Sequence, residues 1–168
     1  PGWNVYFMVT RFPNGVTNLV ENFMDVPHTV FVHEGWFRRK ALKRVPATVK
    51  RAEGSVLVTY KQDQDTVTGL GRLFNPGGLP MVHTDHFFAP NVTRVDYLWG
   101  EKSGFAINSQ ITPIGPMDSL VYTAISYRLP YDLPQALVGR ALKPLVRWYT
   151  TQVIRQDVEV MQVQREGL

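Results

Sequence analysis

The strongest constraint on the fold is a series of short segments between residues 47 and 128 in which apolar side chains recur at every second position. In Ser55–Lys61, for example, Val56, Val58 and Tyr60 occupy alternate positions. This period of two is typical of strands, because successive side chains of a strand point to opposite faces. Glycine and proline separate the segments, so we predict a mostly antiparallel sheet. The predicted strands are Ala47–Lys50, Ser55–Lys61, Thr66–Leu73, Met81–Phe88, Val92–Trp99, Gly104–Ile111 and Leu120–Arg128.

Helical patterns lie on both sides of this sheet in the sequence. Apolar residues recur at helical spacing from Val16 to about Phe37, and Pro27 should break that helix because proline cannot donate the backbone hydrogen bond. Near the carboxyl end, Asp132 is a candidate N-cap, and a second start at Pro144 predicts a long amphipathic helix to about Gln164. The expected fold class is therefore α+β.

Composition limits the remaining possibilities. The chain has 168 residues, of which 44% are hydrophobic, and this is enough for one domain with a substantial core. It contains no cysteine, which excludes disulfides and cysteine-ligated metal sites within these residues. No apolar run approaches the roughly 20 residues needed to cross a bilayer. We expect a soluble, cytoplasmic protein.

The net charge of +4 calls attention to the basic cluster between Arg38 and Arg44. The cluster is compatible with a solvated helix end or with a docking face for an acidic protein. Nucleic-acid binding is the third alternative, but no recognised nucleic-acid motif accompanies the cluster. We therefore expect no nucleic-acid partner.

The segment around Pro27 carries the candidate chemistry. Two of the four histidines, His28 and His33, lie with Asp25 in an otherwise apolar run. Imidazole and carboxylate groups are common metal ligands, and burying them without a partner is costly. In a straight helix the two histidines would be turned roughly 140° apart, so they can bind one ion only if the helix is distorted. Pro27 supplies a reason for such a distortion.

Asp157 is the second unusual residue, because the helical pattern places it on the apolar stripe formed by Val146, Val153, Val160 and Met161. It is either a buried aspartate satisfied by a backbone amide or by Arg155, or a metal ligand.

The other two histidines, His83 and His86, fall in a predicted strand and should point in opposite directions. We interpret them as structural or surface residues, with His86 as the one that could line a pocket.

The motif Glu21-Asn22-Phe23-x-Asp25-x-x-His28-x-x-x-x-His33 resembles the iron-binding segment of Rieske-type non-haem iron oxygenases, in the catalytic domain of the aromatic-ring-hydroxylating alpha subunit. The setting of Asp157 in Gln156-Asp157-Val158 resembles the position of that family's distant carboxylate ligand. The resemblance extends over most of the chain, although its specific motifs occupy only these two ends.

The resemblance implies a helix-grip fold like that of START and Bet v 1 domains, with an antiparallel sheet wrapped around a long C-terminal helix. It also implies roles for individual residues. His28, His33 and Asp157 would bind Fe(II), and Asp25 would carry electrons from a Rieske [2Fe–2S] cluster of a neighbouring subunit. Asn22 would lie near the iron as a supporting residue, and Phe23 and Val153 would contact the substrate.

The same resemblance implies an activity and partners. Residues 1–168 would form a single oxygenase domain that activates O2 to hydroxylate or oxidatively demethylate an apolar aromatic or polycyclic substrate. The Rieske cluster needs cysteines, so we expect its N-terminal domain to be absent from this chain. Electrons would come from NAD(P)H through a ferredoxin or a separate reductase, which the basic cluster could dock. A homotrimer is expected.

Two alternatives stay open at this point. A metal-free helix-grip domain that binds a lipid or sterol would have the same cavity, and it predicts that His28, His33 and Asp157 do not converge. A zinc hydrolase would use the same three ligands around one activated water.

Overall fold

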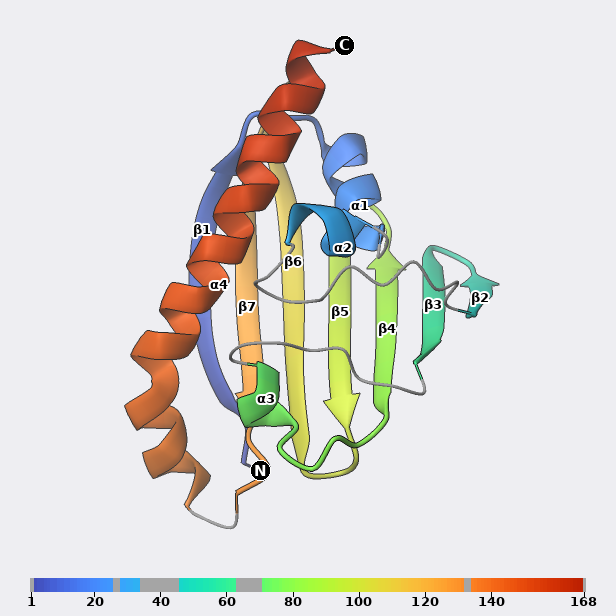
Figure 1. Ribbon diagram of the computed structural model, residues 1–168. Helices are drawn as coiled ribbons and strands as arrows, with labels where there is room; N and C mark the ends of the chain where they lie inside the picture. Colours follow the sequence, from blue (N-terminus) through green and yellow to red (C-terminus); the bar gives the residue numbers. More distant parts are fainter. Residues whose placement is uncertain (1, 26–27, 34–45, 63–70, 132–133, 168) are drawn as a thin grey trace.

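One antiparallel sheet with helices packed on one face makes up the structure, a computed structural model of the chain (Figure 1). It describes residues 2–25, 28–33, 46–62, 71–131 and 134–167. The basic cluster between Arg38 and Arg44 lies outside these residues. The elements, in chain order, are β1 Asn4–Phe12, α1 Val16–Met24, α2 His28–Val32, β2 Ala47–Ala52, β3 Ser55–Gln62, α3 Gly71–Phe74, β4 Met81–Phe88, β5 Val92–Trp99, β6 Ser103–Gly115, β7 Asp118–Arg128 and α4 Gln135–Glu166.

Within the described residues, the sheet has the strand order β1-β7-β6-β5-β4-β3-β2. Strands β2 to β7 therefore form the predicted meander, and β1 adds to its edge by pairing with β7. Strand β1 was not predicted from the sequence. Its inward residues Tyr6 and Phe12 are buried, but Val5, Phe7 and Val9 on its other face are also apolar and remain exposed. The apolar residues on both faces hide the period of two.

The helical break near Pro27 is confirmed. Helix α1 ends at Met24, and α2 begins at His28 in a separate orientation. The predicted strand Thr66–Leu73 is wrong at its described end, because residues 71–74 form the short helix α3. Buried Gly71 and Phe74 hold this turn against the core, and such packing overrides a local strand preference. Residues 63–70 lie outside the described residues.

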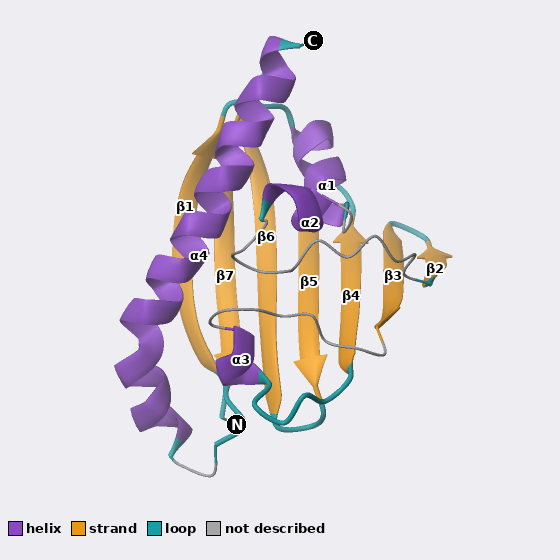
Figure 2. Cartoon of the chain, viewed as in Figure 1, coloured by secondary structure: helices purple, strands orange, loops and turns teal. Residues whose placement is uncertain are grey.

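Helix α4 crosses the same face of the sheet as α1, α2 and α3 (Figure 2). Its predicted start at Pro144 is wrong, because the helix begins at Gln135 and Pro144 lies inside it. Pro144 and Arg140 are both exposed, so water can replace the hydrogen bond that proline cannot donate. The predicted N-cap, Asp132, lies outside the described residues.

Two tyrosines hold α4 on the sheet. Tyr6 of β1 donates its hydroxyl hydrogen to Thr150 Oγ1 at 2.9 Å, and Tyr127 of β7 donates to the carbonyl oxygen of Gly139 at 2.6 Å. A Cβ at Gly139 would lie 2.0 Å from the side chain of Asn4, so any larger residue here would have to displace Asn4. The helix is thereby fixed close to β1 and β7, which determines where its inner face points.

The inner face of α4 agrees with most of the predicted stripe. Val146 and Met161 are buried and Val153 is half-buried, but Val160 is 39% exposed, which corrects its assignment to the inner face. Asp157 is buried on this face. No described helix is long and apolar enough to cross a membrane.

Candidate metal centre

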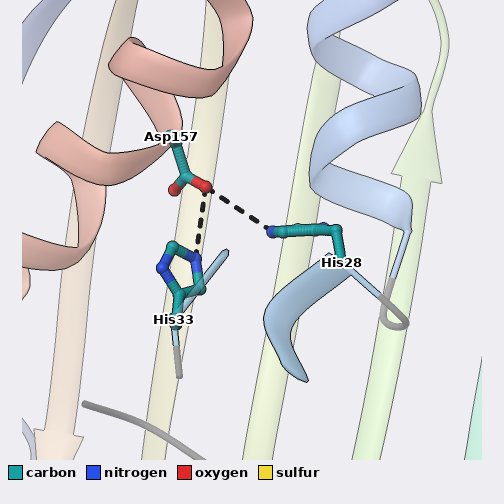
Figure 3. A group of neighbouring side chains, drawn as sticks. All are labelled: His28, His33 and Asp157. Carbon is teal, nitrogen blue, oxygen red and sulfur yellow. Dashed lines mark ion pairs between the residues drawn. The ribbon is translucent and has the colours of Figure 1, made fainter. Parts of the chain in front are cut away.

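Three polar side chains converge between the helices and the sheet (Figure 3). His28 begins α2, His33 directly follows it, and Asp157 reaches them from α4. His28 Nε2 lies 3.5 Å from Asp157 Oδ1, and His33 Nε2 lies 3.2 Å from the same oxygen. One ligand atom from each residue can be chosen so that all three lie within 4.8 Å of one another. The side chains that the sequence separates therefore meet at one point.

The remaining ring nitrogens orient both imidazoles. His28 Nδ1 contacts the backbone carbonyl oxygen of Asp25, and His33 Nδ1 lies 2.9 Å from Gln156 Oε1. A carbonyl oxygen only accepts, so each Nδ1 carries a hydrogen, and each Nε2 is turned toward Asp157. Metal-binding histidines commonly have this arrangement.

Asp157 Oδ1 is buried and has no hydrogen-bond partner among the described residues, although two ring nitrogens face it. Two ring nitrogens and one carboxylate oxygen thus face one another, an arrangement that a metal ion or protons on the rings would stabilise. Ligand atoms at about 2.1 Å from one ion would be roughly 3 Å apart at right angles. The donor set of two imidazoles and one carboxylate fits Fe(II) and also suits zinc.

The electrostatics of the centre favour added positive charge. Burial alone would raise the pKa of Asp157, but the two histidines outweigh burial and hold that pKa below its usual value. Burial likewise would lower the pKa of His28, and the carboxylate of Asp157 reverses this, so the pKa of His28 is raised. Both directions have one cause, which is the attraction between the carboxylate of Asp157 and the protonated forms of the histidines.

One alternative for Asp157 is excluded. Arg155, which could have satisfied the carboxylate, is exposed and instead donates to Glu159 Oε1 at 3.2 Å. It lies on the outer face of α4.

The other predicted site residues surround the centre. Asp25 is exposed at the end of α1, and it also borders the cavity described below. Asn22 is half-buried, and its Nδ2 has no hydrogen-bond partner among the described residues. Phe23 packs edge-on against Phe12 with ring centroids 5.6 Å apart, and both Phe23 and Val153 line the cavity. Their roles in electron transfer, support of the metal and substrate contact stay predictions.

A cavity of about 140 Å³ opens beside the three converging side chains. Its walls are predominantly apolar. Aromatic side chains, which can pack against the ring of a ligand, make up part of this wall: Phe12, Phe74, Tyr97, Trp99, Phe105 and Tyr149. An engineered protein cavity of about 150 Å³ holds one benzene ring, so this space suits a ligand of similar size.

A polar pair that was not predicted from the sequence lies in the same cavity. His83 and Asp85 lie on the inner face of β4, are 0% and 1% exposed, and line the cavity. The prediction that His83 and His86 point in opposite directions is confirmed, but the pocket residue is His83. His86 stacks on Phe88 on the other face, with ring centroids 3.8 Å apart. The His-x-Asp spacing within a strand was the available signal, since residues two apart share a face.

Fold and site together define the class: a helix-grip domain in which two histidines and a carboxylate converge beside an apolar cavity. Residues 16–168 match the family model described as the vanillate O-demethylase oxygenase C-terminal domain, and the chain belongs to that family. The predicted resemblance to the catalytic domain of Rieske-type oxygenases and the predicted fold are confirmed. No curated protein matches the sequence.

Solved structures share the fold at low sequence identity. A structure of dicamba monooxygenase bound to 3,6 dichlorosalicylic acid has a TM-score of 0.80 and 15% identity, and the match covers 99% of this chain and 51% of that chain. Pseudomonas putida CBB5 NdmA with caffeine has a TM-score of 0.71 and 14% identity, with 96% and 43% covered. NdmB from the same source has a TM-score of 0.68 and 16% identity, with 96% and 41% covered. This chain therefore spans about half the length of these proteins.

Proposed function

We propose that this domain binds Fe(II) through His28, His33 and Asp157 and uses O2 to oxidise a small aromatic substrate. The observation that carries the proposal is the convergence of three oriented electron-pair donors on one point beside an apolar cavity. A facial set of two histidines and one carboxylate leaves other positions of the iron open, so the bound metal can supply O2 activation next to the substrate. Family membership supports the same chemistry.

The protein's own residues hold and shield this centre. Gln156 and the carbonyl of Asp25 fix the two imidazoles, so the ligands need little rearrangement when the metal binds. Leu73, Val95 and Ile107 are among the apolar residues that surround the neighbouring space. Such walls exclude water from the reacting groups and place an apolar ring beside the metal ligands.

The cavity size favours a single aromatic ring over a polycyclic substrate, because about 140 Å³ is close to the space that one benzene ring needs. The names of the similar proteins refer to small ring compounds, namely vanillate, 3,6 dichlorosalicylic acid and caffeine. Oxidative demethylation of a methoxy-substituted ring is therefore the reaction we propose, with hydroxylation as the alternative outcome.

Electrons would enter at Asp25. Its exposed side chain can contact a neighbouring protein surface, while its backbone carbonyl contacts His28, a proposed iron ligand. The proposed donor is a Rieske [2Fe–2S] cluster of an adjacent subunit in a homotrimer, supplied by a ferredoxin or reductase and NAD(P)H. Replacing Asp25 with Ala should leave iron bound while abolishing coupled turnover in the intact enzyme, and normal turnover in that variant would remove this role.

Metal analysis combined with electron paramagnetic resonance tests the iron proposal. The protein is purified without oxygen, loaded with Fe(II) and treated with nitric oxide, and a His33→Ala variant serves as the control. A high-spin ferrous-nitrosyl signal that is lost in the control is the expected result. Stoichiometric zinc without reconstitutable iron would favour a hydrolase, and a site that takes up neither metal would favour a metal-free binding domain.

A further inference from the structure

The buried pair His83 and Asp85 gives the cavity a second polar site. Both residues lie on the inner face of β4, whereas the proposed metal ligands come from α2 and α4. His83 Nε2 lies 2.9 Å from Asp85 Oδ1, a distance at which the ring N–H donates to the carboxylate. Both residues line the same cavity as the metal ligands.

One carboxylate oxygen of this pair has no hydrogen-bond partner in the described part of the chain. Asp85 Oδ2 is buried and has no hydrogen-bond partner among the described residues, and the residue is only 1% exposed. The cross-strand neighbours of Asp85 are Val58 on β3 and Val95 on β5, which offer no side-chain donor. A buried carboxylate oxygen without a donor is unfavourable, so its place on the cavity wall calls for a donor from within the cavity.

We propose that Asp85 Oδ2 anchors the substrate by accepting a hydrogen bond from a hydroxyl or amino group on its aromatic ring. The inference rests on the proposed function, because it takes this cavity as the substrate site. It adds a substrate class: a single ring with a hydrogen-bond donor, such as a methoxyphenol. His83 is the positioning residue, since its bond to Oδ1 holds the carboxylate with Oδ2 free.

The carboxylate of Asp85 should select among the substituents of the substrate ring. An ionised carboxylate only accepts hydrogen bonds, so it binds a phenol or an amine and repels a carboxylate group or an ether oxygen. A hydrogen bond to a charged acceptor is also stronger than one between neutral groups. The ring should therefore bind with its donor toward β4.

Binding of a matched pair of ligands tests the anchor. Guaiacol, which is 2-methoxyphenol, and anisole, which is methoxybenzene, differ by one hydroxyl group. Their affinities for the metal-free protein are measured by isothermal titration calorimetry and by quenching of tryptophan fluorescence, because Trp99 lines the cavity. We expect guaiacol to bind about tenfold more tightly than anisole, as one hydrogen bond to a charged group would give.

Three variants make the test specific. Asp85→Leu should bring the affinity ratio close to one, and Asp85→Asn should lower it less, because a neutral amide is a weaker partner. His86→Gln changes the other face of the same strand and should leave the ratio unchanged. Thermal unfolding establishes that each variant is folded, and Asp85→Asn serves if Asp85→Leu does not fold.

Two results would contradict the proposed role of Asp85 in substrate binding. The first is that the wild-type protein binds guaiacol no more tightly than anisole, and the second is that both Asp85 variants keep the preference for guaiacol. Because binding is measured without metal, this failure can be separated from that of the oxygenase proposal. A lost preference with normal iron loading removes the anchor alone. A preserved preference in a protein that never loads iron removes the oxygenase proposal alone.

Discussion

The cavity contains two clusters of the same residue types, and they differ in how complete their internal contacts are. In the strand pair, His83 donates to Asp85 at 2.9 Å, which satisfies one carboxylate oxygen. In the helix cluster, two ring nitrogens lie 3.2 and 3.5 Å from one oxygen of Asp157, and that oxygen has no hydrogen-bond partner among the described residues. The difference teaches that a histidine beside an aspartate does not by itself define a metal site. In the helix cluster, two histidines face one carboxylate oxygen, and the Nδ1 of each ring contacts a carbonyl oxygen outside the cluster.

The largest expected effect is on metal binding. Asp157→Ala should reduce Fe(II) affinity by more than about 100-fold, because a charged ligand is lost from a three-ligand set. The variant Asp85→Leu, which removes the aspartate of the other cluster, should bind Fe(II) as the wild type does. Competition with a coloured chelator measures both affinities. Equal losses in the two variants would contradict the assignment of the metal to the helix cluster.

The second prediction concerns the stability of the strand pair. His83→Leu should destabilise the metal-free protein by about 3 kcal/mol, because it leaves the carboxylate of Asp85 buried without a partner. The double variant His83→Leu/Asp85→Leu should recover much of this loss, since both polar groups are then removed. Urea unfolding followed by circular dichroism gives the free energies of unfolding. If the double variant is less stable than the single one, Asp85 must make stabilising interactions other than its contact with His83.

A smaller effect is expected at Gln156, which orients His33. Gln156→Leu should weaken Fe(II) binding by about 10- to 100-fold while all three ligands remain, as is typical when the partner of a metal-binding histidine is removed. Gln162→Leu is the matched control, because Gln162 is exposed on the same helix. Should both variants bind iron equally well, the contact with Gln156 would have no role in orienting His33.

The smallest effect is expected at Tyr6, which joins β1 to α4 away from both clusters. Tyr6→Phe should cost about 1 kcal/mol of stability through the lost bond to Thr150 and should leave Fe(II) affinity unchanged. Chemical denaturation gives the first value and chelator competition the second. A large loss of iron affinity would mean that the position of α4 depends on this one hydrogen bond.

The raised pKa of Tyr6 leads us to expect that the free energy of unfolding depends on pH above pH 10. Burial raises the pKa of Tyr6 to about 12, despite the hydrogen bond with Thr150, and burial also raises the pKa of Tyr149 to about 12. The unfolded chain loses these protons near pH 10, so between pH 10 and 12 it binds fewer protons than the folded chain. The free energy of unfolding should therefore fall as the pH rises through this range. Tyr6→Phe should reduce the slope, and an unchanged slope would contradict the shift at Tyr6.

The helix cluster could be predicted in part because its residue types are rare in their surroundings. Two histidines in an apolar run and an aspartate on an apolar helix face are local anomalies, and the family resemblance linked them. The pair His83 and Asp85 was missed because a polar residue every second position also occurs on the solvent face of a strand. Only the packing of the sheet shows that this face of β4 is buried.

The sequence by itself determined the period of the strands, the helical break at Pro27 and the residue types of the metal centre, because these depend on neighbouring residues in the chain. It did not determine that β1 would pair with β7, that α4 would continue through Pro144, or which face of β4 would line the cavity. The tertiary structure decided these features. Strand pairing, solvent access to a helix and the side of a sheet that helices cover depend on contacts between segments far apart in the chain.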